Sequence, residues 1–282
     1  MKTVRIIPRL DIKGPNLVKG IHLEGLRVLG RPADFAKYYY EQGADELIFM
    51  DVVASLYERN NLQDIISETA KEIFIPITVG GGIRSLSDIK SLLRIGADKI
   101  SINTAAIKRP EIIKEASEEF GSSTIVIAIE AIKNPDGNYY AFMDNGREFS
   151  GLEVVEWARS VEILGAGEIL ITSVDREGTG KGIDIDLINL ITQAVNLPVI
   201  VHGGIGSMAD VEKAIDLGFV DSFALGSSLH YEAINNFTFQ TGNVIEGNMD
   251  FLLSKSQDKN YSNSFKLSEL KQYLRSKHVI CR

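Results

Sequence analysis

Residues 75–102 read IPITVGGGIRSLSDIKSLLRIGADKISI, and residues 197–225 read LPVIVHGGIGSMADVEKAIDLGFVDSFAL. Five of the residue pairs that the two stretches share mark a constant offset of 122, beginning with Pro76 and Pro198. The other pairs are Gly81 and Gly203, Gly82 and Gly204, Ser85 and Ser207, and Asp88 and Asp210. GADELIFMDV at 43–52 and GAGEILITSV at 165–174 match at the same offset. One spacing over two strand–helix units indicates a fold built from two related halves.

Short apolar runs recur along the whole chain, with amphipathic stretches between them. Each run is typical of a buried parallel strand, and several amphipathic stretches end in Gly-Ala or Gly-Phe, as a helix stop should. The expected strands are residues 5–10, 46–51, 75–79, 99–102, 125–129, 168–172, 199–202 and 222–225. Eight such units predict an α/β fold, a closed (β/α)8 TIM barrel built from two half-barrel repeats. The alternative fold is an open, doubly wound parallel sheet, but the sequence shows no sign of the point where the strand order of such a sheet reverses.

The repeat also bears on domain organisation. At about 150 residues per domain, a chain of 282 residues suggests two domains. The repeat instead predicts one barrel over 1–282, with half-barrels of about 1–121 and 122–282. Residues 134–147 (NPDGNYYAFMDNGR) carry DG and NG turn signals and predict a hairpin excursion. Residues 235–265 form an insertion before the last helix, either a tolerated surface loop or a surface for a partner or substrate.

Composition excludes several classes of protein. Hydrophobic residues make up 44% and charged residues 24%, which is ordinary for a globular protein and excludes a mainly disordered chain. The formal net charge of -8 argues against nucleic-acid binding. The single cysteine, Cys281, allows no intrachain disulfide, which fits a reducing compartment. We find neither the apolar core of a signal peptide nor a membrane span, so we expect a cytoplasmic protein.

Two glycine runs follow strands and precede helices, at the barrel face where active sites lie. They are residues 80–82 and 203–204, and Asn103 with Thr104 and Gly226 with Ser227 follow the next strand in each half. Glycine lets backbone N–H groups approach an anion, and a helix N-terminus adds partial positive charge. Each half could therefore hold one phosphate, which predicts a long substrate with a phosphate at each end. The alternative is that the glycines only make tight turns.

Two acids, Asp11 and Glu130, end strands one and five, which correspond between the halves. Paired acids can serve as general acid and general base if their surroundings separate their pKa values. Alternatively, each acid only caps a helix or joins an ion pair. The four histidines are dispersed without metal-ligand spacing, so we expect no metal and no other cofactor.

A third group of charged residues opens four of the strands at the opposite end of the barrel. These residues are Arg5, Glu46, Lys99 and Glu168. Two cations and two anions there could form a ring of ion pairs, unless they are only a solvated rim.

Six motifs in order at barrel spacing resemble the cyclase subunit of imidazole glycerol phosphate synthase. They are RIIPRLDIKGPNLVKG, GADELIFMDVVAS, FIPITVGGGIRS, GADKISINTAA, GAGEILITSVDREGTGKG and LPVIVHGGIGS. The resemblance runs from about residue 1 to 230 and resumes in the last helix. The isomerase of histidine biosynthesis shares the half-barrel repeat, but INTAA and LITSVDREGTGKG look more like the cyclase.

The resemblance implies a lyase that works with a separate glutaminase subunit on the barrel floor. Ammonia from that partner would cross the barrel and react with a bis-phosphorylated aminoimidazole carboxamide ribotide. The products would be imidazole glycerol phosphate and aminoimidazole carboxamide ribotide, in histidine biosynthesis. Asp11 and Glu130 match the catalytic positions, and Arg5, Glu46, Lys99 and Glu168 match a gate to the ammonia passage. Substrate or phosphate positions fall on Lys19, Gly81, Gly82, Asn103, Thr104, Thr172, Asp175, Glu177, His202, Gly203, Gly204, Gly226 and Ser227.

This chain departs from the family pattern mainly at the active face. Glu130 and Glu177 stand where aspartates are usual, while Arg9 and His202 replace small residues. Insertion 235–265 has no counterpart, whereas the gate is retained. This pattern leaves an alternative open, in which the barrel delivers ammonia to a sugar amidotransferase. That enzyme would convert an acetamido sugar of a surface polysaccharide to an acetamidino sugar. An isomerase that works without ammonia is a third reading.

Overall fold

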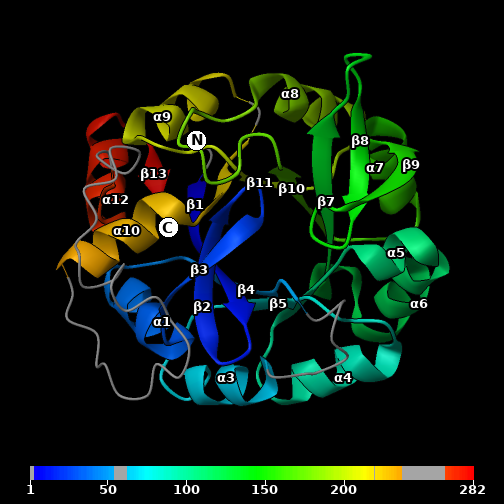
Figure 1. Cartoon of the computed structure of the whole chain (residues 1–282), viewed down its shortest axis with the longest axis horizontal. Helices are drawn as coiled ribbons and strands as arrows, with labels where there is room; N and C mark the ends of the chain where they lie inside the picture. Colours follow the sequence, from blue (N-terminus) through cyan, green and yellow to red (C-terminus); the bar gives the residue numbers. More distant parts are fainter. Residues whose placement is uncertain (1–2, 54–61, 219, 237–263) are drawn as a thin grey trace.

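Strand β1 (Thr3–Lys13) belongs to a closed ring of eight parallel strands in the computed structural model (Figure 1). The structure describes residues 3–53, 62–218, 220–236 and 264–282, so most of insertion 235–265 lies outside the described residues. Around the ring follow β4 (Leu47–Asp51), β5 (Ile77–Gly80), β6 (Lys99–Ile102), β7 (Ile125–Lys133), β10 (Glu168–Ser173), β11 (Val199–His202) and β12 (Ser222–Leu225). Arg5 of β1 pairs with Ser222 of β12, which closes the ring. The predicted (β/α)8 TIM barrel is confirmed.

Helices surround the barrel between successive strands (Figure 1). They are α1 (Pro32–Glu41), α3 (Leu62–Thr69), α4 (Leu86–Arg94), α5 (Thr104–Lys108), α6 (Glu111–Phe120), α7 (Val154–Ile163), α8 (Ile185–Ala194), α9 (Met208–Asp216), α10 (Ser227–Asn236) and α12 (Leu267–Ser276), with the short 3₁₀ turn η1 (Ser122–Thr124) before β7. Within the described ranges, no helix combines the length and the apolar character that a membrane span requires.

The repeated stretches adopt the same local structure. Ser85 and Ser207 each begin a helix with a capping box, completed by Asp88 and Asp210. The glycines after β5 and β11 are also equivalent, because Gly81 has a φ of 97° and Gly203 a φ of 104°. A Cβ atom on Gly81 would overlap the carbonyl oxygen of Asp51, and one on Gly203 that of Ser173. Only glycine fits both positions, since it tolerates this φ and leaves room for the neighbouring strand.

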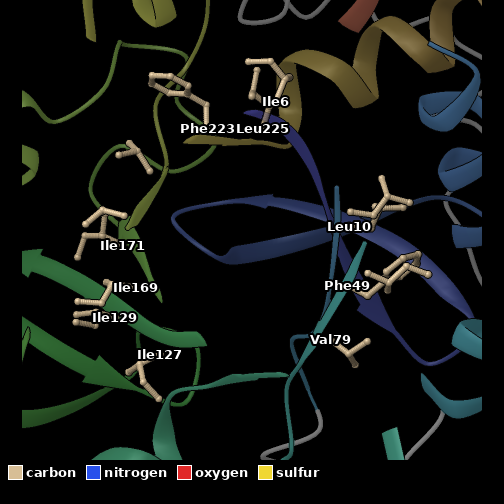
Figure 2. Packing of buried hydrophobic residues seen from close by; sticks show 14 of the residues in the cluster. Ile6, Leu10, Phe49, Val79, Ile127, Ile129, Ile169, Ile171, Phe223 and Leu225 are labelled. Carbon is tan, nitrogen blue, oxygen red and sulfur yellow. The ribbon is translucent and has the colours of Figure 1, made fainter. Parts of the chain in front are cut away.

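Alternation along the strands divides the buried side chains into two clusters. Ile6, Leu10 and Ile12 of β1 join the large cluster shared with the helices, and Figure 2 shows Ile6 and Leu10 in that cluster. Ile7 belongs to a smaller cluster, to which neighbouring strands contribute residues such as Ile48, Val126, Leu170 and Ile200. Because successive side chains of a strand point to opposite faces, Arg5, Arg9 and Asp11 lie on the same inward side as Ile7.

Two antiparallel excursions are attached to the carboxyl ends of β1 and β7. Strands β2 (Asn16–Ile21) and β3 (Glu24–Gly30) extend β1 as a hairpin that the sequence analysis does not predict. Strands β8 (Tyr139–Met143) and β9 (Glu148–Glu153) extend β7, so the excursion expected at 134–147 continues to Glu153. At the other end of β1, strand β13 (Ile280–Cys281) pairs with Thr3 and Val4.

Candidate active site

The Glu130 side of the barrel mouth is an open cavity of about 510 Å³. We use this name for Gly81, Gly82, Asn103, Thr104 and Glu130, which come from the carboxyl ends of β5, β6 and β7 and all line the cavity. Three exposed or half-buried cationic residues, Arg84, Lys108 and Arg109, line it as well. The cavity therefore offers glycine backbone, a helix start and positive charge around a carboxyl group.

Glu130 is a buried acid at the barrel mouth. Its Oε2 accepts a hydrogen bond from the backbone N–H of Gly146 in the turn between β8 and β9 (2.8 Å). Burial nevertheless raises the pKa of Glu130 to about 7, because it outweighs the opposing effects of Arg9 and of that hydrogen bond. Near neutral pH this carboxyl group is therefore poised to give or take a proton.

The opposite, Asp11 side of the mouth is nearly filled. We use this name for Asp11 together with His202, Gly203, Gly204, Gly226 and Ser227. The last five line a cavity of only about 50 Å³, which Glu177 also borders. At the offset of the repeat, the position of His202 corresponds to Gly80 in the first half, so an imidazole ring occupies this side where the other side has no side chain.

Arg9 controls the charge of Asp11. Its Nε donates to Asp11 Oδ1 (2.9 Å), and Lys19 Nζ lies 3.6 Å from Asp11 Oδ2. Burial acts to raise the pKa of Asp11, but Arg9 and Lys19 together lower it below the ordinary value. Asp11 is thus held as a carboxylate, whereas Glu130 exchanges its proton near neutral pH. The strand sequence accounts for the contrast, since the residue two before Asp11 is Arg9 and the residue two before Glu130 is Ala128.

Arg9 also reaches across the barrel to β10 and β11. Its Nη1 donates to Thr172 Oγ1 (3.2 Å) and lies 3.1 Å from His202 Nδ1. Burial lowers the pKa of His202 well below its ordinary value, and the charges of Arg9 and Lys19 lower it further. His202 is therefore a neutral imidazole.

The Lys19 side chain is buried between two carboxylates and has almost no contact with solvent. It forms an ion pair with Glu177, in addition to its approach to Asp11. Glu177 Oε2 also accepts the backbone N–H of Leu23 at the tip of the β2–β3 hairpin (2.9 Å). Asp175, by contrast, is exposed and accepts the backbone N–H of Lys133 (2.8 Å), and it borders neither of the two cavities.

Four charged residues at the barrel floor form a closed cycle of ion pairs, which we call the floor ring. Arg5 Nη1 lies 2.7 Å from Glu46 Oε1, and Arg5 also pairs with Glu168. Lys99 Nζ lies 3.1 Å from Glu46 and 3.0 Å from Glu168. Burial acts to raise the pKa of Glu46, but the two cations lower it below its ordinary value. The structure thus brings together all four residues singled out at the strand starts.

From the sequence, Arg9 is only a departure from the family pattern and is not among the expected site residues. The signal was present, because Arg9 and Asp11 stand two apart in one strand and must share a face. Gly146 could not be placed at Glu130 from the sequence, since its position depends on how the β8–β9 turn folds back over the mouth.

Comparisons with known proteins agree with this geometry. A family model described as "Histidine biosynthesis protein" matches residues 5–235. Three relatives described as "Imidazole glycerol phosphate synthase subunit HisF" are similar over most of the chain. The protein of Legionella pneumophila is 57% identical over 210 residues, 74% of this chain and 99% of its own length. That of Alkaliphilus metalliredigens is 46% identical over 235 residues, 83% of this chain and 93% of its own. That of Lactococcus lactis subsp. cremoris (strain SK11) is 47% identical over 232 residues, 82% of this chain and 90% of its own.

The family model spans both halves of the barrel, the mouth and the floor ring. The matches favour the cyclase over the sugar-amidation alternative, since all three relatives are described as subunits of the synthase. The chain belongs to the HisF family, the cyclase subunits of imidazole glycerol phosphate synthase in histidine biosynthesis.

Proposed function

We propose that this chain uses ammonia to convert a bis-phosphorylated aminoimidazole carboxamide ribotide to imidazole glycerol phosphate and aminoimidazole carboxamide ribotide. One observation carries the proposal: two buried carboxyl groups face the same barrel mouth, and their pKa values are shifted in opposite directions. Asp11 is a carboxylate beside Arg9, and Glu130 has a pKa of about 7. A reaction that joins ammonia to carbon and closes a ring must remove protons from nitrogen and supply them to a leaving group. An acid and a base at one site provide both.

The glycine loops support a substrate with two anionic ends. In this proposal Gly81, Gly82 and Thr104 bind one phosphate in the open cavity on the Glu130 side. Gly203, Gly204 and Ser227 are to bind the other on the Asp11 side. Ser227 Oγ is buried there and has no hydrogen-bond partner among the described residues, so a phosphate oxygen would satisfy it.

The barrel interior supports a route for ammonia from the floor to the mouth. Above the floor ring lies the small apolar cluster around Ile7 and Leu170. Two hydroxyls on this inward side, Thr78 Oγ1 and Ser101 Oγ, are buried without a partner in the described part of the chain. Neutral ammonia can cross an apolar passage, and hydroxyl groups can hydrogen-bond it on the way, whereas ammonium would pay a large desolvation cost. The floor ring is then the gate at the entrance.

The partner that supplies ammonia is proposed to be a glutaminase docked on the barrel floor. Exposed apolar side chains gather in segments at this end. Phe74, 81% exposed, precedes β5, and Ile163, 85% exposed, ends the helix before β10. Leu217 precedes β12, and Ile280 lies in β13 beside the start of β1. Scattered exposed apolar residues are ordinary, but four around one charged entrance suit an interface.

The decisive experiment is an assay of the purified chain with the ribotide and an excess of an ammonium salt near neutral pH, without a glutaminase. We expect imidazole glycerol phosphate to form, and Asp11→Asn to lower kcat by about 10²–10⁴-fold. Asp216→Asn, at an exposed position on α9, is the matched control and should match the wild type. Absence of product from the wild-type chain would reject the proposal.

The same preparation tests the docking face and the alternative function. With a glutaminase and glutamine in place of ammonium, Phe74→Glu should reduce turnover while ammonium-dependent turnover stays unchanged. A chain that binds the glutaminase and transmits ammonia but never converts the ribotide would instead fit delivery to a sugar amidotransferase.

A further inference from the structure

Arg9 is a buried cation that holds Asp11 charged, and its further contact with His202 has no part in the proposed reaction. It lies on the inward side of β1, and its guanidinium contacts residues of three strands, Asp11, Thr172 and His202. We propose that Arg9 is a positioning residue that fixes His202 in the neutral tautomer protonated on Nε2. The Asp11 side of the mouth then offers an anion a neutral N–H donor at this position. That the anion is a phosphate rests on the proposed function, whereas the tautomer follows from geometry.

The hydrogen-bond chemistry of arginine determines the tautomer. Arg9 Nη1 lies 3.1 Å from His202 Nδ1. A guanidinium has donors and no acceptor, so Nδ1 must be the acceptor and carries no proton. The ring proton of a neutral imidazole is then on Nε2. Thr172 Oγ1, 3.3 Å from the same Nδ1, can donate to it while accepting from Arg9.

The backbone of Arg9 is held in place by the same kind of contact. His230 on α10 has its Nε2 2.9 Å from the carbonyl oxygen of Arg9, so this nitrogen is the donor. Its Nδ1 lies 2.6 Å from the hydroxyl of Tyr39 on α1, which donates to it. This chain of contacts anchors β1 to two helices at the residue whose side chain reaches His202.

Charges on every side of His202 oppose its protonation or are already paired. The cations are Arg9 on β1 and Lys19 on β2, and the other histidine nearby is His230 on α10. Of the neighbouring acids, Asp11 pairs with Arg9, and Glu177 pairs with Lys19. Among the described residues, no carboxylate lies within hydrogen-bond distance of the His202 ring, so nothing compensates a charge on it.

The free nitrogen of His202 belongs to the proposed anion site. His202 lines the small cavity with Gly203, Gly204 and Ser227. The hydrogen bonds that the His202 side chain makes within the described ranges are all made by Nδ1, and Ser227 Oγ is buried there without a partner. A phosphate oxygen could accept hydrogen bonds from the N–H of His202 and the hydroxyl of Ser227. The backbone of Gly203 and Gly204, both in the left-handed region, lies beside them.

The test is ¹⁵N NMR of the full chain labelled at histidine, with His202→Asn to assign the His202 signals. We expect an unprotonated Nδ1 and a protonated Nε2 between pH 5.5 and 7.5. Titration with inorganic phosphate should shift the Nε2 signal. A protonated Nδ1, a charged ring in this range, or no response to millimolar phosphate would overturn the proposal.

Arg9→Met tests the action of Arg9. We expect His202 to titrate within this pH range and to populate both tautomers. As the pH falls from 7.5 to 5.5, its phosphate affinity relative to the wild type should rise by roughly tenfold, because the ring gains charge. Arg159→Met, at an exposed arginine of α7, is the matched control. Arg9→Lys keeps a buried cation and should keep His202 neutral, which provides a second variant if Arg9→Met does not fold.

An unchanged His202 in Arg9→Met would reject Arg9 as the positioning residue. The NMR measurements need no turnover, so their failure is distinct from failure of the ribotide assay.

Discussion

The two sides of the barrel mouth are built from repeated sequence, yet they differ in cavity volume and in the pKa values of their carboxyl groups. The Glu130 side is a cavity of about 510 Å³ around a carboxyl group with a pKa of about 7. The Asp11 side has about 50 Å³ and a carboxylate tied to Arg9. Two inward positions account for the difference. Arg9 stands where β7 has Ala128, and His202 stands where β5 has Gly80. A repeat therefore preserves the backbone of a site while single side chains decide its chemistry.

The largest effect is expected from removing the titrating acid. Glu130→Gln should lower kcat for ribotide conversion by about 10²–10⁴-fold, because the amide cannot exchange a proton. In the wild type, at constant free ammonia, the rate should fall as the pH rises through about 7 and Glu130 loses its proton. Steady-state kinetics across pH check this, with Glu119→Gln at an exposed position of α6 as the control. A Glu130→Gln chain with wild-type kcat would contradict the role of Glu130.

The two acids should affect stability with opposite signs. The folded-state pKa of Glu130 is raised from 4.5 to about 7, so ionisation destabilises the fold as the pH rises between these values. Relative to wild type, Glu130→Gln should gain about 3 kcal/mol in free energy of unfolding between pH 4 and pH 8. Asp11 has a lowered pKa, so its contribution is present above its unfolded-state pKa and is lost as the pH falls through the folded-state value. Asp11→Asn should therefore lose stability relative to wild type as the pH rises through the acid range below about 4, and should change little between pH 4 and pH 8.

Urea unfolding at several pH values measures both differences. Parallel curves for the two variants would show that the electrostatic contrast between the sides is absent.

A smaller and equal effect is expected at the repeated glycines. Gly81→Ala and Gly203→Ala each force a side chain into a left-handed backbone and against a neighbouring carbonyl oxygen. Each variant should lose about 1–3 kcal/mol in free energy of unfolding. Gly137→Ala is the control, since it has a φ of 89° but open space around it, and should lose less. Markedly unequal losses at 81 and 203 would show that the two loops are not structurally equivalent.

The smallest effect concerns the helix starts. Ser85→Ala and Ser207→Ala each remove one side of a capping box and should cost about 1 kcal/mol. Thermal unfolding of both variants, with Ser160→Ala on the exposed face of α7 for reference, checks the equality. A cost at only one of the two positions would confine the equivalence of the halves to the glycine loops.

The sequence predicted the barrel because its signals are local and repeated. Eight apolar runs, helix stops and the offset of 122 all follow from residues close together in the chain. The β2–β3 hairpin escaped prediction because NLVKGI and EGLRVLG are short and carry charge and glycine. Their turn uses His22 and Leu23 with positive φ, which is uncommon outside glycine.

By itself the sequence determined which residue types reach the barrel mouth and floor, because strand alternation and strand ends fix their positions. Only the tertiary structure decided their chemistry. Arg9 meets His202 across 193 residues of chain, and the charge of this one side chain opposes protonation of both His202 and Asp11. A pKa depends on burial and on charges brought close in space, and closing the barrel supplies both. The two halves therefore share a fold that can be read from the chain and differ in an electrostatic state that cannot.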